Sequence, residues 1–160
     1  MSSSLLMSSP GAEPVVIEAL FAARPARVFQ AWSSADELRL WFGSTDKPPR
    51  SIEIDFRVGG NWRCTFAADD GAQDALFGQY VVIEPDRRLV FSWTHQRTAS
   101  DGNITTTQPS QVTVTFEATS DGARVRLIHE AIVREAGRRG VGGGWSESFT
   151  KLSELVHSAG

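Results

Sequence analysis

The sequence predicts an α+β fold in which a curved antiparallel sheet of about seven strands packs on one long C-terminal helix. Two observations lead to this prediction. Between Ser51 and Glu130, apolar and polar residues alternate in one short run after another, which is typical of strands with one buried face. Beyond residue 144, apolar residues instead recur at helical spacing as far as Val156. A single antiparallel sheet has one face to bury, and this helix is its main cover.

The segment before the sheet region predicts one strand followed by two short helices. Residues 14–21 read "PVVIEALF" and form the first strand. Pro25 stands near the start of a helix, where its missing N–H costs little. Ser34 precedes Glu37 by three residues, a capping-box pattern for a second helix, and Gly43 is expected to end that helix in a left-handed conformation.

Six further strands are expected in the middle of the chain. The turn sequences "VGG", "DDGAQ", "EPDR" and "SDG" separate several of them, and turns this short join only antiparallel neighbours. The polar segment 96–110 is expected to be a mobile loop. The predicted strands are Ser51–Arg57, Asn61–Ala67, Ala75–Glu84, Arg88–His95, Gln111–Ala118 and Arg124–Glu130.

The final helix is predicted from an amphipathic stripe formed by Trp145, Phe149, Leu152, Leu155 and Val156. Five glycines between residues 137 and 144 precede this stripe, and we expect them to give a flexible entry or a close backbone approach. They do not form a phosphate-binding loop, because no Gly-Lys-Ser or Gly-Lys-Thr follows them.

The composition is that of a soluble single-domain protein. The 160 residues are 41% hydrophobic and 22% charged, which is enough apolar material for a core without metal or disulfide. We expect the serine-rich residues 1–12 to be a flexible tail and residues 13–158 to form one domain. A net charge of −3 without a basic patch argues against a nucleic-acid partner, and no apolar run is long enough to span a bilayer. The single cysteine, Cys64, suits a reducing cytoplasm.

Five segments together resemble a known family. They read "RPARVFQAWSSADELRLWFG", "IDFRVGGNWR", "FGQYVVIEPDRRLVFSW", "VTVTFEATSDGARVRLIHE" and "GGGWSESFTKLSELV". In this order they resemble the SRPBCC (START/Bet v1-like) superfamily, and within it a small bacterial branch similar to the C-terminal domain of the activator of the heat-shock-protein-90 ATPase. The resemblance implies a helix-grip fold with a cavity between the sheet and the C-terminal helix. It implies no single activity, because the superfamily includes lipid and hormone binders, polyketide cyclases and hydroxylase domains.

Aromatic residues with the inward parity of their strands are the candidate ligand-binding residues. The chain has five tryptophans, nine phenylalanines and one tyrosine, so its aromatic side chains are large and mostly apolar. Small-molecule pockets are mostly apolar as well. Two histidines share this parity, and a histidine could orient a ligand or act as a general base. The alternative for each residue is plain core packing or, for a histidine, one backbone partner. The predicted set is Trp62, Phe66, Phe91, Trp93, His95, His129, Trp145 and Phe149.

Other kinds of site have little support in the sequence. Three histidines and one cysteine without a paired spacing predict no metal site, and we expect no cofactor. The nucleophile elbow Gly-x-Ser-x-Gly is missing, so no catalytic residue is assigned. Cys64 shares the parity of Trp62 and is expected to be a small buried hydrophobe.

Three functions follow from these observations. The favoured one is a cytoplasmic module that binds an apolar or aromatic small molecule or lipid under the last helix, with His129 or His95 as the polar anchor. The second is an enzyme of the cyclase, dehydratase or hydrolase type on the same pocket, ranked lower because few polar residues point inward. The third is a chaperone-associated module of the stress response, which the resemblance implies. The sequence leaves homodimer formation through an open sheet edge undecided.

Overall fold

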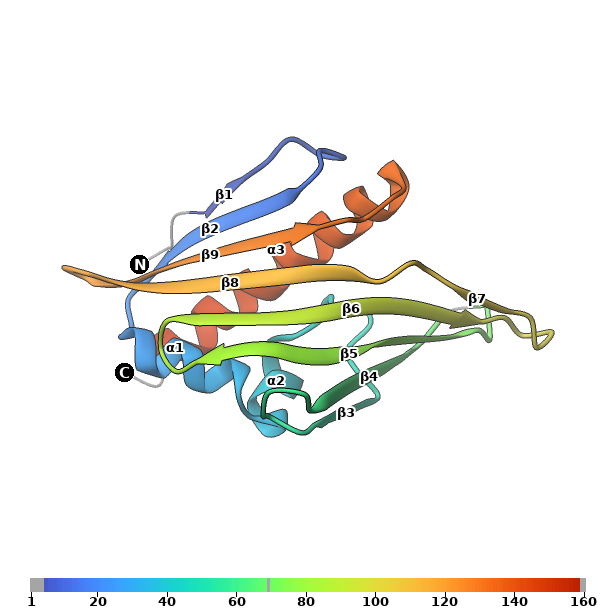
Figure 1. The fold of residues 1–160 in the computed structure, drawn as a ribbon, viewed down its shortest axis with the longest axis horizontal. Coiled ribbons are helices and arrows are strands. Elements are labelled where there is room, and N and C mark those ends of the chain that lie inside the picture. Colours follow the sequence, from blue (N-terminus) through green and yellow to red (C-terminus); the bar gives the residue numbers. More distant parts are fainter. Residues whose placement is uncertain (1–4, 69, 159–160) are drawn as a thin grey trace.

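The part of the chain that the structure describes forms one antiparallel sheet with three helices on one face, and the predicted α+β class is confirmed (Figure 1). The computed structural model describes residues 5–68 and 70–158. Its elements are β1 Leu5–Met7, β2 Val15–Phe21, α1 Pro25–Trp32, α2 Ala35–Trp41, β3 Ser51–Ile54, β4 Asn61–Ala67, β5 Gln73–Glu84, β6 Arg88–Thr98, β7 Ile104–Thr106, β8 Ser110–Thr119, β9 Gly122–Glu130 and α3 Glu135–Ser158.

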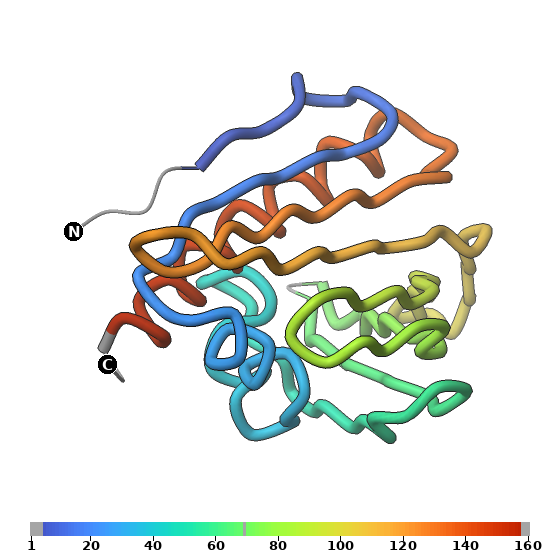
Figure 2. Tube along the Cα trace, turned by 60° about the vertical axis from the view of Figure 1, so that its left-hand side comes forward, coloured from blue at the N-terminus to red at the C-terminus, as the bar shows by residue number. Residues whose placement is uncertain are grey.

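The strands lie in the order β1-β2-β9-β8-β6-β5-β4-β3, with β7 paired to the far end of β6. All neighbours are antiparallel, and the described residues contain nine strands where about seven were expected. The long helix α3 runs along β2, β9 and β8, while α1 and α2 lie beside its C-terminal half (Figure 2). The core therefore lies between the concave face of the sheet and these helices.

Local sequence accounts for the first elements. In β2, residues at odd positions from Val15 to Phe21 are buried, as the alternation predicts. Helix α1 begins at Pro25. Helix α2 follows Ser34, whose side-chain oxygen accepts a hydrogen bond from the Glu37 backbone N–H at 3.4 Å. Gly43 has a φ of +94°, which confirms the predicted left-handed turn after α2.

The strand ends differ from the expected ones in the middle of the sheet. Strand β6 continues to Thr98 and pairs with β7, so part of the segment expected as a mobile loop is sheet. Strand β3 stops at Ile54 instead of the predicted Arg57, because Asp55 and Arg57 lie in a turn closed by backbone hydrogen bonds. All three residues of β7 are exposed, so its sequence shows no alternation of buried and exposed positions that would reveal it.

The final helix begins ten residues before the predicted stripe, and the glycine-rich segment is helical. Tertiary contacts hold this first half in place, since Arg138 donates to the carbonyl oxygens of Gly11 at 2.7 Å and Ile132 at 2.8 Å. An i,i+4 ion pair between Glu135 and Arg139 adds to them. The segment expected to give a flexible entry or a close backbone approach is therefore helical in this structure.

The N-terminal segment adds an edge strand. Leu5–Met7 form β1 on β2, and the Ser8 hydroxyl accepts a hydrogen bond from the Val16 backbone N–H at 2.9 Å. Residues 5–12 therefore differ from the expected flexible tail, whereas residues 1–4 lie outside the described residues. Among the described helices, none has both the length and the hydropathy that crossing a membrane requires.

Candidate functional site

Seven buried aromatic rings fill the layer between the sheet and the helices, and we call them the aromatic cluster. Neighbouring ring centroids lie 5.4 to 6.4 Å apart, mostly in tilted or edge-to-face arrangements, which are favourable for aromatic pairs. The cluster consists of Trp32, Phe42, Trp62, Phe91, Trp93, Trp145 and Phe149.

Backbone geometry explains why these rings meet. Phe91 and Trp93 are two residues apart in β6 and point to the same face, and Trp62 of β4 lies on that face. Trp145 and Phe149 are four residues apart in α3, so they share the side of the helix that covers the sheet. The two layers therefore meet through aromatic side chains.

The contacts within the aromatic cluster occupy the space where the resemblance implied a cavity. Two surface hollows, of about 260 and 170 Å³, lie elsewhere, on the outer face over β1, β2 and β9. Leu6 and Glu18 line both hollows. Their volumes are below the roughly 300 Å³ at which small-molecule pockets begin. A ligand under α3 therefore requires the rings to move apart.

His129 lies fully buried at one edge of the aromatic cluster, in a chain of hydrogen bonds. The Trp145 Nε1–H donates to His129 Nδ1 at 3.2 Å, which leaves the imidazole proton on Nε2. Nε2 then donates to Ser110 Oγ at 2.7 Å, and this hydroxyl donates to the Trp93 carbonyl at 3.1 Å. Burial lowers the pKa of His129 from 6.5 to about 3, so the ring is neutral. Because both of its nitrogens are engaged, His129 orients Trp145 and is not poised as a base.

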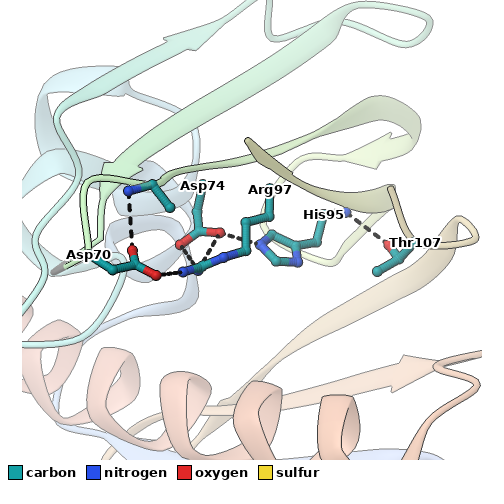
Figure 3. A network of polar contacts seen from close by, with 6 residues as sticks. Asp70, Asp74, His95, Arg97 and Thr107 are labelled. Carbon is teal, nitrogen blue, oxygen red and sulfur yellow. Dashed lines mark hydrogen bonds and ion pairs between the residues drawn. The ribbon is translucent and has the colours of Figure 1, made fainter. Parts of the chain in front are cut away.

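Four charged or titratable side chains meet on the same sheet face, where β5 begins and β6 ends, and we call them the rim cluster (Figure 3). They are Asp70, Asp74, His95 and Arg97. Asp74 stands between His95 and Arg97, with its Oδ1 2.9 Å from His95 Nε2 and its Oδ2 3.2 Å from Arg97 Nη1. Arg97 Nη2 also lies 2.9 Å from Asp70 Oδ2.

Strand register places the rim cluster beside the apolar interior. Asp74 pairs with Phe66 on one side and with Arg97 on the other, so the three side chains form one row. The rim is partly solvated, and the Asp74 side chain, the least exposed of the four, is 22% exposed. The backbone N–H of Ala72 holds the pKa of Asp70 below its usual value, and Arg97 adds to this effect. A histidine held by a carboxylate suits polar recognition and is also the geometry of a general base.

The structure brings most of the predicted site residues together. Trp62, Phe91, Trp93, Trp145 and Phe149 belong to the aromatic cluster, and His129 contacts it. Phe66 is half-buried and lies 6.4 Å from the Phe42 ring, between the cluster and the rim. His95 is set apart in the rim cluster. Burial raises the pKa of Cys64 to about 12, so this thiol is no nucleophile.

The prediction missed Ser110 and Asp74, which hydrogen-bond to the two histidines, and Arg97, which pairs with Asp74. Ser110, Asp74 and Arg97 each stand one or two residues outside the strand limits expected from the sequence. Extending β5, β6 and β8 by their flanking polar residues would have placed these side chains on the inward face. Trp32 and Phe42 of the aromatic cluster were not among the predicted site residues.

Comparisons with known proteins agree with this architecture. A family model described as "Activator of Hsp90 ATPase homolog 1-like protein" matches residues 22–157. No curated protein matches the chain.

Three solved bacterial structures share the fold. One from Chromobacterium violaceum is 23% identical, with a TM-score of 0.78 over 91% of this chain and 98% of its own. A protein named AHSA1 from Silicibacter pomeroyi is 23% identical, with a TM-score of 0.77 over 92% and 99%. A protein from Rhizobium leguminosarum is 24% identical, with a TM-score of 0.75 over 99% of both chains. At these identities the likeness shows the fold alone.

Proposed function

The chain belongs to the family of activator of Hsp90 ATPase homolog 1-like proteins, and we propose that it binds an apolar or aromatic small molecule between its sheet and α3. The family and its fold suggest a ligand-binding or activator-like module. The observation that supports ligand binding is the aromatic cluster, in which rings from the sheet, from α1 and α3 and from the end of α2 converge.

The aromatic cluster supplies the affinity in this proposal. Removing apolar surface from water is worth about 25 cal/mol per Å², less the cost of association. Rings on both layers can sandwich a flat apolar molecule without giving up contact area, because ring–ring contacts are replaced by ring–ligand contacts. The hydrogen bond from Trp145 to His129 keeps the α3 side of the site oriented.

The first half of α3 is the segment best suited to open the site. Each glycine in a helix interior costs about 1 kcal/mol relative to alanine, and five of the eight residues before Trp145 are glycine. The rim cluster, by contrast, lies on and beside β5 and β6 and is tied together by ion pairs. We therefore assign the entrance to residues 135–144, whose unwinding would free one side of Trp145.

Native mass spectrometry of the protein purified from its cells, set against its denatured mass, tests the proposal. We expect an additional mass that is lost on denaturation. A Leu6→Asp variant, altered only in the outer hollows, should carry the same additional mass. A native mass equal to that of the chain alone contradicts the proposal, and an additional mass lost in Leu6→Asp moves the site to the outer face.

An activator-like protein interaction is the second candidate, and the apolar β1–β2 edge favours it. Leu5, Leu6, Met7 and Leu20 are exposed there, Leu6 to 63%. The family description points to a chaperone of the Hsp90 class as the partner. In this case a pulldown with the bacterial Hsp90 homologue retains the wild type and loses the Leu6→Asp variant.

A further inference from the structure

The indole N–H of Trp32 is a buried hydrogen-bond donor without an acceptor. Within residues 5–68 and 70–158, it is the one fully buried side-chain polar atom for which no hydrogen-bond partner is found. Trp32 is the last residue of α1 and is 3% exposed. An unpaired buried donor costs about 1–3 kcal/mol, so its presence in the core needs a reason.

Three other indoles of the core have their donors matched. The Trp41 Nε1–H donates to the Ala31 carbonyl at 3.0 Å, and that of Trp62 donates to the Ser92 carbonyl at 3.0 Å. The Trp145 Nε1–H donates to His129 Nδ1. The fold therefore supplies an acceptor for each of these three buried indoles, and Trp32 departs from this pattern.

Five aromatic rings lie around Trp32. Trp145 stacks on it at 5.8 Å with an interplanar angle of 28°, and Trp41 meets it edge-on at 4.7 Å. The rings of Phe91, Phe116 and Phe149 lie 6.3 to 6.4 Å away. A buried water needs two to four polar partners. Phenyl rings offer none, so a water is a poor match for this donor.

We propose that Trp32 Nε1 donates a hydrogen bond to an uncharged acceptor of the bound ligand, a step that rests on the proposed function. Trp32 lies inside the aromatic cluster and stacks on Trp145, the ring next to the glycine-rich half of α3. A ligand that parts these two rings brings its own atoms to the Trp32 donor. The unmatched N–H is then a polar anchor that is satisfied only in the complex.

The same surroundings define the chemical class of the ligand. A carboxylate or phosphate would be a buried charge among rings that supply no counter-charge, which is costly. An alcohol or phenol would bring an O–H donor that finds no acceptor on the phenyl rings. The matching group is a ketone, aldehyde, ester or ether oxygen on an otherwise apolar, preferably aromatic, molecule.

A pair of probes with the same shape tests this inference. 1-Acetonaphthone carries a carbonyl acceptor, and 1-isopropenylnaphthalene replaces that oxygen with a methylene group. Both are titrated by calorimetry into the wild type, into Trp32→Phe, which lacks the donor, and into Trp41→Phe, which removes a neighbouring indole with a matched donor. We expect the wild type and Trp41→Phe to bind the ketone about tenfold more tightly than the alkene, because the alkene leaves the donor unpaired. In Trp32→Phe the ratio should fall to about one.

The possible outcomes distinguish a failure of the Trp32 hydrogen bond from a failure of the proposed ligand binding. If both probes bind and Trp32→Phe keeps the preference for the ketone, Trp32 is not the donor and the inference is overturned. If both bind the wild type equally, the inference also fails while the binding function stands. If neither binds the wild type, the proposed function fails and the inference fails with it.

A measurement on the wild type covers the case in which Trp32→Phe does not fold. The indole N–H signal of Trp32 in a ¹⁵N-resolved NMR spectrum should move downfield with 1-acetonaphthone and not with 1-isopropenylnaphthalene. The Trp41 signal serves as the control, because its acceptor is the Ala31 carbonyl. Equal movement of the Trp32 signal with both probes overturns the inference.

Discussion

His129 shows how one residue links the sheet to α3. It lies on β9, accepts from Trp145 of α3 and donates to Ser110 of β8. In the folded state a proton on Nδ1 would face the Trp145 N–H, donor against donor. Burial and this geometry both favour the neutral ring, and in this conformation His129 connects Trp145 of α3 to Ser110 of β8.

The low pKa of His129 predicts acid sensitivity. Above pH 6.5 the imidazole is neutral in the folded and the unfolded chain, and between pH 6.5 and about 3 only the unfolded chain takes up the proton. Folding stability that is fully present above pH 6.5 is therefore lost as the pH falls, by roughly 3 kcal/mol at pH 4. Because His129→Gln has no such group, its free energy of unfolding should approach that of the wild type as the pH falls. Urea titrations at pH 7 and pH 4 measure this difference.

His95 provides the matched control for this prediction. Its side chain is 38% exposed and rests against Asp74. We expect His95→Gln to change the free energy of unfolding by less than about 1 kcal/mol at pH 7, because a partly exposed side-chain pair contributes little to stability. A constant difference between the wild type and His129→Gln at both pH values contradicts the role assigned to His129.

At the scale of elements, strands with one clearly buried face were the easiest to predict. The limits of β4 were predicted to the residue and those of β2 to within one, because apolar and polar residues alternate through both. The ends of β5 and β6 were predicted too short, since polar residues of the rim cluster occupy their inward positions. The first half of α3 was missed because glycine disfavours helix, and contacts with residues far away in sequence override this preference.

Replacing glycines in α3 tests whether this half of the helix is a weak element. An added methyl group at Gly140, Gly143 or Gly144 would meet no atom within 4 Å. We expect Gly→Ala at these three positions together to raise the free energy of unfolding by about 2–3 kcal/mol. If residues 135–144 are the entrance, the triple variant should also release bound naphthalene more slowly. Urea unfolding and stopped-flow fluorescence measure the two effects.

Gly59 is the control for this series. A methyl group added there would likewise meet no atom within 4 Å, but the φ of Gly59 is +84°. Gly59→Ala should therefore destabilise the protein, because alanine is strained in the left-handed region. A triple α3 variant that is less stable than the wild type, or that releases naphthalene at the wild-type rate, contradicts the assignment of the entrance.

At the scale of the whole molecule, the sequence predicted which rings face inward but not whether they touch. Strand parity and helical spacing identify the inward side of each element, and this was sufficient for Trp62, Trp93 and Trp145. Whether a cavity remains depends on how closely α3 approaches the sheet. That distance follows from packing over the whole interface, such as the stacking of Trp32 on Trp145, and not from any local pattern.

The most direct test of the central claim is to locate bound naphthalene by intermolecular nuclear Overhauser contacts. The account predicts contacts between naphthalene protons and the indole protons of Trp32 and Trp145, in the layer between the sheet and α3. Contacts with Leu6 and Leu20 at the outer hollows, or none with the protein at all, would contradict it.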